Sequence, residues 1–512
     1  MAGKHKPERA VCPVTVDTVR TEARQQFEEL LDCCQQSACS FWEFEKHLRD
    51  LLAALACVLV RLFLTAWHRR LELQPYLQTG THRLGDSYAE RRLKTAYGTV
   101  TYGRAHLIHR HGGHGFHPLD AVLGLTRDHF SPGLMQLVAR LATRLSYPAT
   151  RLVCQAVLGW SPATEAIEQV VLGLGRQAAP FVQQQAAPPD DGDVLVIEVD
   201  GKCPPTATEA ELRKRRGQRQ HRPGGACGCQ RHRGRAKRRT RGSKKRRKKG
   251  DKSKNGKEVM VVVLYTLRRG ADGQLHGPIN KKVWASFAGR KAAALWARAE
   301  ATKRGFGSET TKTVQVVLDG ALGLKQNLEP LFPRAIFTLD ICHLVEKLWD
   351  LGHRFHAEGS AELQAWVEEL KTLVYQGRVA ELVERLRGLQ KHVPTHGPGT
   401  KSRRQTLEKL IGYLEPRLSM MRYHEWIEQD LVIASGQVEG AVRHVVGERL
   451  DCAGMRWLQG KAEALLHLRC IELNGDWEDF FAWAHQRHQN ELREQRRVKV
   501  LTDEPLTLTG AA

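Results

Sequence analysis

The feature that most constrains the fold is an almost continuous apolar run at residues 194–199, which ends at Asp200. Valine, leucine and isoleucine make up most of the run, and such a β-branched run is typical of a central strand covered on both faces. Similar segments follow at residues 259–267, 282–287, 313–318 and 335–339. With a helix expected at residues 291–303, they predict an α/β domain built on a mixed five-stranded sheet.

Helical spacing of apolar residues predicts helices on both sides of this domain. Residues 147–158 and 161–174 predict two helices joined by a turn at Gly159. Ser161 is the expected N-cap of the second helix, with Pro162 in its first turn. This is a helix-turn-helix pattern, which can place its second helix in the DNA major groove; an ordinary helical hairpin is the alternative.

The order of these segments predicts six regions along the 512 residues. Leucine and phenylalanine stripes without strand character predict an all-helical insertion inside the α/β domain. The regions are a helical N-terminal region at 1–90, a region with the helix-turn-helix pattern at 91–185, the first part of the α/β domain at 186–344, the helical insertion at 345–430, the last part of the α/β domain at 431–475, and a charged tail at 476–512.

Nearly all of the net charge of +23 lies in one segment. Residues 213–257 hold 22 lysines and arginines against one acid, so the rest of the chain is almost neutral. Paired with phosphates, these side chains release condensed counterions, so a polyanion such as double-stranded DNA is the natural partner. A solvated tract is the alternative. The densest part consists of Lys244, Lys245, Arg246, Arg247, Lys248 and Lys249.

No secretory signal or membrane span is expected. The longest apolar run, at residues 51–60, is interrupted by Arg61 and is interpreted as a buried helix. The 12 cysteines are scattered, as in a protein with reduced thiols. These features favour the cytoplasm.

Acidic residues suggest the chemistry. Asp200 and Asp319 each close an apolar strand and precede a glycine, so both are expected at the same edge of the sheet. Glu439, on a helix after the insertion, is the expected third acid. Three carboxylates can hold two Mg²⁺ ions, or Mn²⁺, for displacement at phosphorus. Asp340 is an alternative second acid, and Glu448 or Asp451 an alternative third.

Four stretches resemble insertion-sequence transposases of the ISKra type. They are Val199 to Thr208, Gly250 to Gly256, and Ser435 to Val442 together with Asp451 to Trp457. The resemblance implies a DDE enzyme of a bacterial insertion sequence. Its RNase H-like core would carry a helical insertion before the last acid, as in Mutator-like transposases. It implies Asp200, Asp319 and Glu439 as the catalytic and metal-binding acids.

The resemblance also suggests contacts with DNA. In Mutator-like enzymes a Cys/Asp-x-x-His element follows the second aspartate, and Asp340-Ile341-Cys342-His343 matches it. His343 is then expected to position DNA, or else to be a packed histidine. Arg443 is expected to contact DNA or neutralise Glu439, and Arg456 with Trp457 to stack on a base, with core packing the alternative for Trp457. Since two DNA ends must be joined, a homodimer or larger assembly is expected.

Two segments contain cysteines or histidines that could bind zinc. One contains Cys227 and Cys229 with flanking histidines, and the other has five histidines between residues 106 and 117, although neither has a standard spacing. A different class of function also fits the chain. It is a catalytically inactive DNA-binding protein derived from a transposase.

Overall fold

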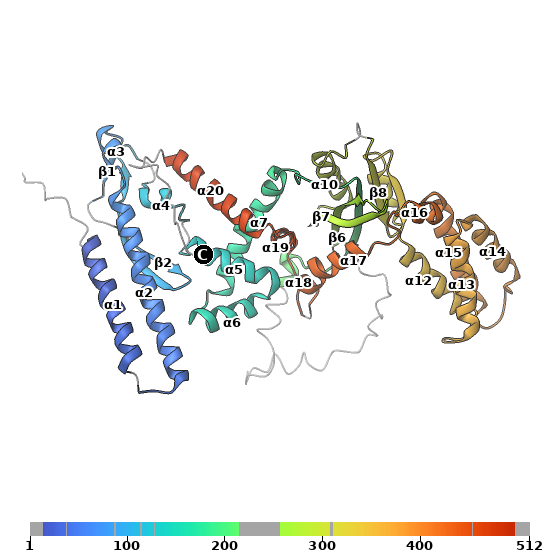
Figure 1. The fold of residues 1–512 in the computed structure, drawn as a ribbon, viewed down its shortest axis with the longest axis horizontal. Coiled ribbons are helices and arrows are strands. Elements are labelled where there is room, and N and C mark those ends of the chain that lie inside the picture. Colours follow the sequence, from blue (N-terminus) through green and yellow to red (C-terminus); the bar gives the residue numbers. More distant parts are fainter. Residues whose placement is uncertain are drawn as a thin grey trace, which may run out of the picture. The chain divides into compact units, whose positions relative to one another are not determined.

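The computed structural model describes residues 14–36, 38–85, 89–112, 115–126, 129–213, 257–307, 311–452 and 454–496 (Figure 1). The chain forms two compact units, Met1–Gln177 with Asp476–Ala512, and Ala178–Gly475. The basic run Lys244, Lys245, Arg246, Arg247, Lys248 and Lys249 lies outside the described residues, as do Cys227 and Cys229.

The second unit is α/β and contains one mixed five-stranded sheet, in the order β7-β6-β5-β8-β9. Strands β5, β8 and β9 are parallel, whereas β6 is antiparallel to both β5 and β7. All five predicted strands are confirmed. The strands are β5 (Val194–Lys202), β6 (Val259–Arg269), β7 (Leu275–Ser286), β8 (Thr313–Leu318) and β9 (Ile336–Leu339).

Strand β7 begins at Leu275, seven residues before the predicted start at 282. This first part pairs with the end of β6, and several of its residues are exposed. Polar residues are therefore tolerated there, and no apolar run marks the strand in the sequence.

The interior of the sheet is buried on both faces. Every residue from Val194 to Val199 is buried, as predicted for a covered central strand. Helix α10 (Arg290–Lys303) packs on β6, α17 (Gly436–Ala441) on β5 and β6, and α19 (Gln459–Leu473) on β7. Helix α11 (Leu322–Leu328) packs against α10.

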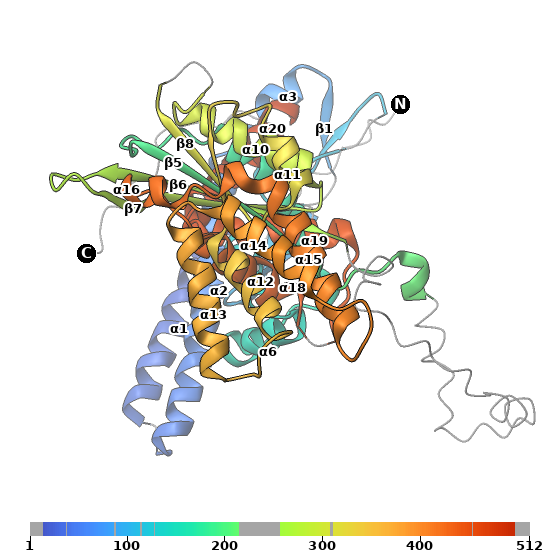
Figure 2. The same ribbon diagram turned by 90° about the vertical axis from the view of Figure 1, so that its right-hand side faces the viewer.

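The segment between β9 and α17 is entirely helical. Figures 1 and 2 show its longer helices gathered together, and α12 packs on α13, α13 on α14 and α14 on α15. Leucines and valines of the predicted stripes, among them Leu363, Val367 and Leu382, form its core. The elements are α12 (Ile341–Gly352), α13 (Ala361–Tyr375), α14 (Val379–His392), α15 (Thr400–Leu414), η3 (Glu415–Met420) and α16 (Tyr423–Glu428).

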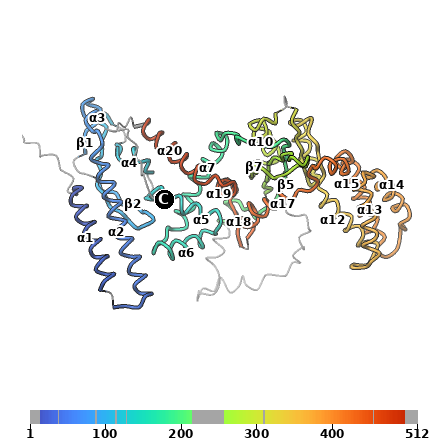
Figure 3. Tube along the Cα trace, in the orientation of Figure 1, coloured from blue at the N-terminus to red at the C-terminus, as the bar shows by residue number. Residues whose placement is uncertain are grey.

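The first unit has no break at the predicted boundary of residue 90. One core cluster joins Leu64 and Leu71 to Leu93, Val100 and Leu119 across that boundary. The elements are α1 (Val16–Gln36), α2 (Phe41–Arg69), α3 (Gln74–Gln78), β1 (His82–Leu84), β2 (Ala89–Thr95), β3 (Gly98–Arg104), β4 (Leu107–His109), α4 (Pro118–Val122), α5 (Pro132–Arg144), α6 (Tyr147–Leu158), α7 (Thr164–Gln184), whose residues from Ala178 belong to the second unit, and α20 (Trp477–Arg496) (Figure 3).

Helices α6 and α7 differ in how well the sequence predicted them. Helix α6 has the predicted bounds, and Gly159 ends it in the left-handed conformation. Helix α7 begins at Thr164, so the prediction of Ser161 as its N-cap is wrong. It also continues ten residues beyond 174 and through Pro180. Burial of Phe181 and Val182 accounts for this extension, because their packing offsets the backbone hydrogen bond that Pro180 cannot donate.

Two further expectations need correction. Residues 477–496 of the predicted tail form α20, whose Trp477 and Phe480 are buried. Helix α2 was expected to be buried, yet only 11% of its most apolar 18-residue window is. In the described part of the chain, α2 is the one helix long and apolar enough to cross a membrane, which by itself is weak support for a span.

Candidate active site

Three aspartates follow one another across the carboxyl edge of the sheet. Asp200, Asp319 and Asp340 stand on or directly after the parallel strands β5, β8 and β9. The residues immediately before them are paired in register across the three strands. Parallel pairing in register brings the aspartates to the same edge, as the sequence predicted for Asp200 and Asp319.

Asp200 and Asp319 each have one oxygen engaged by the backbone. The Gly201 N–H donates to Asp200 Oδ1 at 2.6 Å, and the Ala321 N–H donates to Asp319 Oδ1 at 2.9 Å. Within the described ranges, no hydrogen bond reaches Oδ2 of either residue. Each aspartate thus has a fixed orientation and an oxygen available to a ligand.

The acids repel one another. Burial raises the pKa of Asp200, and the charges of Asp319 and Glu439 raise it further. The Gly201 N–H and His343 act in the opposite direction without cancelling the effect. A carboxylate in this position is stabilised by a cation, and hard oxygen ligands of this kind suit Mg²⁺.

Glu439 comes from α17, which a buried acid of the sheet holds in place. Glu198 on β5 is fully buried and accepts hydrogen bonds from the Val438 N–H at 2.8 Å and from the Tyr265 hydroxyl at 2.7 Å. Val438 is the neighbour of Glu439, so this contact fixes the helix that carries the third acid. The Glu439 side chain itself is 49% exposed.

Glu198 is a site residue that the sequence interpretation missed. A carboxyl group inside a strand covered on both faces needs hydrogen-bond donors, and this requirement was visible in the run Val-Ile-Glu-Val. Burial raises the pKa of Glu198 to about 7, although its hydrogen bonds from Tyr265 and Val438 act to lower it.

The helix after Glu439 has a widened turn. Residues of η4 (Val442–Gly447) form a π-helix between α17 and α18 (Glu448–Leu450), where an uninterrupted helix was expected. Single π turns are rare and often occur at functional sites. This turn shifts the residues after it relative to the face that presents Glu439.

Asp340 is the centre of a second group. Donor atoms of Asp340, His343 and Glu439 lie within 4.8 Å of one another, the one such cluster of three or more among the described residues. Asp340 Oδ2 accepts from His343 Nδ1 at 2.5 Å and from the Ser435 hydroxyl at 2.8 Å. Its Oδ1 accepts from the Cys342 N–H at 3.0 Å, which caps α12.

The Asp340 group could also hold a metal ion, through one donor atom each of Asp340, His343 and Glu439. The hydrogen bond from His343 to Asp340 raises the His343 pKa to about 9, so the imidazole is protonated at neutral pH. Binding of a metal to His343 would therefore have to displace this proton. Burial would raise the pKa of Asp340, but the hydrogen bonds from His343, Ser435 and Cys342 outweigh it and keep this pKa low. Asp340 is therefore a buried carboxylate that holds a charged His343 beside Glu439.

The alternative third acids are engaged elsewhere. Glu448 accepts from His444 at 2.7 Å and from Arg469 at 3.0 Å. Asp451 lies 3.2 Å from the Lys202 ammonium. Both carboxylates have close cationic partners, whereas the contacts of Glu439 are longer, 3.9 Å to His343 Nδ1 and 3.4 Å to the Ser435 hydroxyl, which favours Glu439 as the third ligand.

Arg290 is a cation near the acids that the sequence interpretation did not single out. At the start of α10, it donates to Glu258 through Nε at 3.2 Å and Nη2 at 3.0 Å. These bonds raise its pKa, to which the charge of Asp319 also contributes. Its side chain is 40% exposed, so it offers a fixed positive charge close to Asp319.

The predicted DNA-contacting residues fall into two classes. Arg443 and Arg456 are exposed. No ion pair joins Arg443 to Glu439 among the described residues; the charge of Arg443 instead lowers the pKa of Glu448 in company with other groups. Trp457 is only 8% exposed, its Nε1 donates to the Leu450 carbonyl at 3.1 Å, and its ring stacks under Arg449. Its burial supports core packing rather than stacking on a base.

This difference gives a prediction for two adjacent residues. We expect Trp457→Ala to lower the free energy of unfolding by about 3–5 kcal/mol, because it removes a large buried ring. Arg456→Ala should leave the unfolding free energy within about 0.5 kcal/mol, as for other exposed positions. Thermal unfolding of both variants measures the difference, and equal small effects would contradict the packing of Trp457.

The histidine-rich segment forms no three-residue metal cluster in the described part of the first unit. His106 stacks on His117 with ring centroids 4.7 Å apart, and burial lowers the His117 pKa to about 4. The described cysteines are all free thiols, as expected.

Comparisons with known proteins give no family assignment: no protein-family model matches the chain, and no similar curated protein was found.

Proposed function

We propose that this chain is an insertion-sequence transposase that cuts DNA at the ends of its element and transfers the cut strand to a target. The observation that carries the proposal is that Asp200 and Asp319 follow paired residues at one edge of the sheet, with Glu439 near enough for its charge to raise the Asp200 pKa. These residues come from two parallel strands and a helix that lies 120 residues after Asp319 in the sequence. Convergent, partly accessible carboxylates with oxygens to spare suit metal-dependent phosphoryl transfer.

The architecture supports this proposal. A mixed five-stranded sheet with helices on it fits an RNase H-like core, and the helices from α12 to α16 fit an insertion before the last acid. The resemblance to ISKra-type transposases, drawn from separate stretches, points to the same three acids. We therefore propose this core and insertion for the second unit.

Mg²⁺, or Mn²⁺ in its place, is the proposed cofactor, with oxygens of Asp200, Asp319 and Glu439 as its ligands. When bound, the cation supplies activation of the attacking oxygen and stabilisation of the leaving oxygen. Glu198 and Ser435 hold the helix of Glu439 in place. Asp340 keeps His343 charged, and Arg290 adds a second cation, so both can contact phosphate oxygens of the DNA backbone.

DNA is the proposed partner of the remaining cationic groups. The tract with Lys244 to Lys249 would contribute sequence-independent binding through phosphates. Exposed Arg443 and Arg456 lie on the segments around Glu439 and would contact DNA near the acids. We place the reaction in the cytoplasm, on double-stranded element ends and target.

The test is strand cleavage of labelled duplexes that carry the ends of the element encoding this chain. We expect cleavage with Mg²⁺ or Mn²⁺, none with EDTA, and a loss of about 10³-fold in Glu439→Gln. Glu448→Gln is the matched control, since it makes the same change nine residues along and should keep more than about half of the activity. If the chain binds the DNA but cleaves it with neither Mg²⁺ nor Mn²⁺, it is an inactive DNA-binding protein. Loss of cleavage in Glu448→Gln but not in Glu439→Gln would assign the third ligand to Glu448 instead.

A further inference from the structure

The α2 helix carries an apolar face that is exposed in this chain. Residues on one side of the helix, at 41, 42, 45, 48, 49, 52, 53 and 56, follow the spacing of a single helical stripe. At its start, Phe41 is 73% exposed and Trp42 is 71% exposed. Two large aromatic side chains next to each other in water indicate a surface that is covered in the functional protein.

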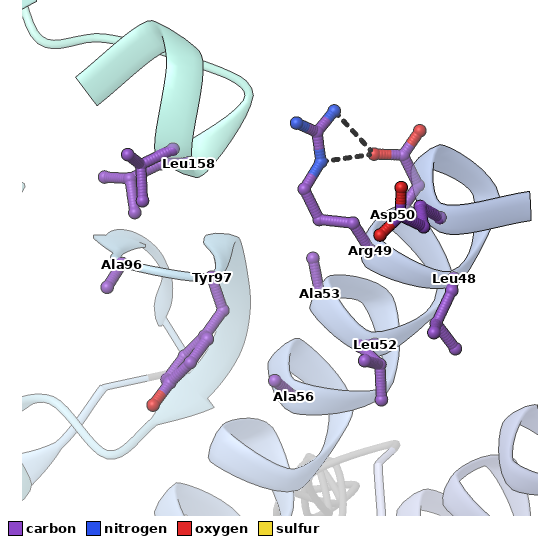
Figure 4. Close-up of a pocket in the computed structure, with 11 residues that line it drawn as sticks. Leu48, Arg49, Asp50, Leu52, Ala53, Ala56, Ala96, Tyr97 and Leu158 are labelled. Atoms are coloured by element: carbon purple, nitrogen blue, oxygen red, sulfur yellow. Dashed lines mark hydrogen bonds and ion pairs between the residues drawn. The ribbon is translucent and has the colours of Figure 1, made fainter. Parts of the chain in front are cut away.

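Further along, the same stripe forms one wall of a groove. The groove has a volume of about 490 Å³, and its other wall is Tyr97 of the β2–β3 turn with Val157 and Leu158 of α6. Figure 4 shows Tyr97 and Leu158 across open space from the face of α2. On the α2 side, Ala53 and Ala56 leave room for a bulky side chain.

We propose that a second copy of this chain covers this surface, with the two α2 helices antiparallel about a two-fold axis. In that arrangement Phe41 and Trp42 of each copy enter the groove of the other, against Ala53, Ala56 and Tyr97. An isologous contact of this kind requires a surface that is complementary to itself. The stripe meets this requirement, since the large residues stand at one end and the small ones at the other.

Charge complementarity selects the antiparallel direction. The charged residues that line the groove are Glu45, Arg49 and Asp50, and Arg49 pairs with Asp50 within the same copy at 3.4 Å. The register that sets Phe41 opposite Ala53 also sets Glu45 of each copy opposite Arg49 of the other. A parallel pairing would set Glu45 against Glu45 and arginine against arginine, which is unfavourable.

The elements that carry this surface are held in position. A complete capping box between Ser40 and Glu43 fixes the first turn of α2, and with it Phe41 and Trp42. Arg49 bonds to Asp50 and to the Ala156 carbonyl of α6, so its guanidinium stays at the groove. Preorganised side chains lose less conformational entropy on association.

The experiment is sedimentation of the full chain over a range of concentrations, without DNA or divalent metal. We expect a reversible dimer whose dissociation constant rises at least about 30-fold in Phe41→Ala/Trp42→Ala. Glu45→Arg and Arg49→Glu should each weaken association at least about tenfold, and the double variant Glu45→Arg/Arg49→Glu should restore it to within about threefold. Glu408→Arg, the same change at an exposed position of α15, should have no effect.

Circular dichroism of each variant must match the parent chain, as expected for substitutions at exposed positions. A chain that is monomeric at all concentrations would overturn the proposal. The groove would then have another occupant, such as a lipid surface or the terminal residues of the same chain. A dimer that is indifferent to these substitutions would also overturn it, because its interface lies elsewhere. Cleavage plays no part in the measurement, so its outcome is independent of the proposed chemistry.

Discussion

Asp200→Asn is expected to lower strand cleavage by about 10³-fold and, at the same time, to raise the thermal stability of the metal-free protein. The two effects have one cause. Burial and the charges of Asp319 and Glu439 raise the Asp200 pKa, so the ionised form destabilises the folded state. A neutral amide removes that cost while keeping the oxygen that accepts from the Gly201 N–H.

The direction of this stability change follows from the linkage between proton binding and folding. A carboxyl group whose pKa is raised on folding contributes stability when protonated and loses that contribution as pH rises through the folded pKa. Above the folded pKa of Asp200 the parent chain has lost this contribution, whereas the neutral amide of Asp200→Asn does not titrate. The melting temperature without metal should therefore be higher in the variant, and the difference should shrink as the pH falls.

With divalent metal present, the parent chain should have the higher melting temperature of the two proteins. We expect Mg²⁺ to bind the proposed site of the folded parent chain and so to raise its melting temperature by mass action. Asp200→Asn offers a weaker ligand and should show a much smaller shift, with cleavage lower by about 10³-fold. Asp193→Asn, an exposed aspartate at the start of the same strand, is the control. A variant that is less stable than the parent without metal would contradict the electrostatic account of this site.

Much of the sheet could be predicted because the strands have a local signature. Runs such as 194–199 and 313–318 are apolar on both faces, which few other structures require. Their last residues then fixed the positions of Asp200 and Asp319 at one edge. The start of β7 and the extension of α7 through Pro180 had no such signature, since pairing and burial by distant residues stabilise them.

The site beyond its three acids could be predicted less well for a similar reason. The roles of Asp340 and His343 depend on Ser435, which lies 95 residues away from Asp340. Whether Trp457 is free or buried depends on Leu450 and Arg449 around it. No spacing rule encodes such contacts. Glu198 is the exception, because a buried acid in an apolar strand could have been recognised from its neighbours alone.

Glu198→Ala is expected to have a large effect on both stability and cleavage, although Glu198 is not proposed as a metal ligand. The substitution removes a fully buried side chain and leaves the Val438 N–H and the Tyr265 hydroxyl without their acceptor. The free energy of unfolding should fall by about 3 kcal/mol or more. Cleavage by the remaining folded protein should fall by about 10²-fold, since displacement of α17 misplaces Glu439.

Glu198→Gln separates the charge from the contacts. A glutamine oxygen can accept from the Val438 N–H, while its amide donates to the Tyr265 oxygen, so α17 should remain in place and cleavage should be largely retained.

In the parent chain the Glu198 pKa rises on folding to about 7. The protonated carboxyl therefore contributes stability in full below the unfolded pKa of about 4.5, and this contribution is lost as pH rises through 7. From pH 5 to 8 the parent should lose about 2.5 kcal/mol that the glutamine variant does not lose. Calorimetry of both proteins across this range gives their unfolding free energies. The contributions of the other titrating groups cancel in the difference between the two. A pH-independent difference would mean that the carboxylate is well solvated, and Glu198 would then not be the buried anchor of the Glu439 helix.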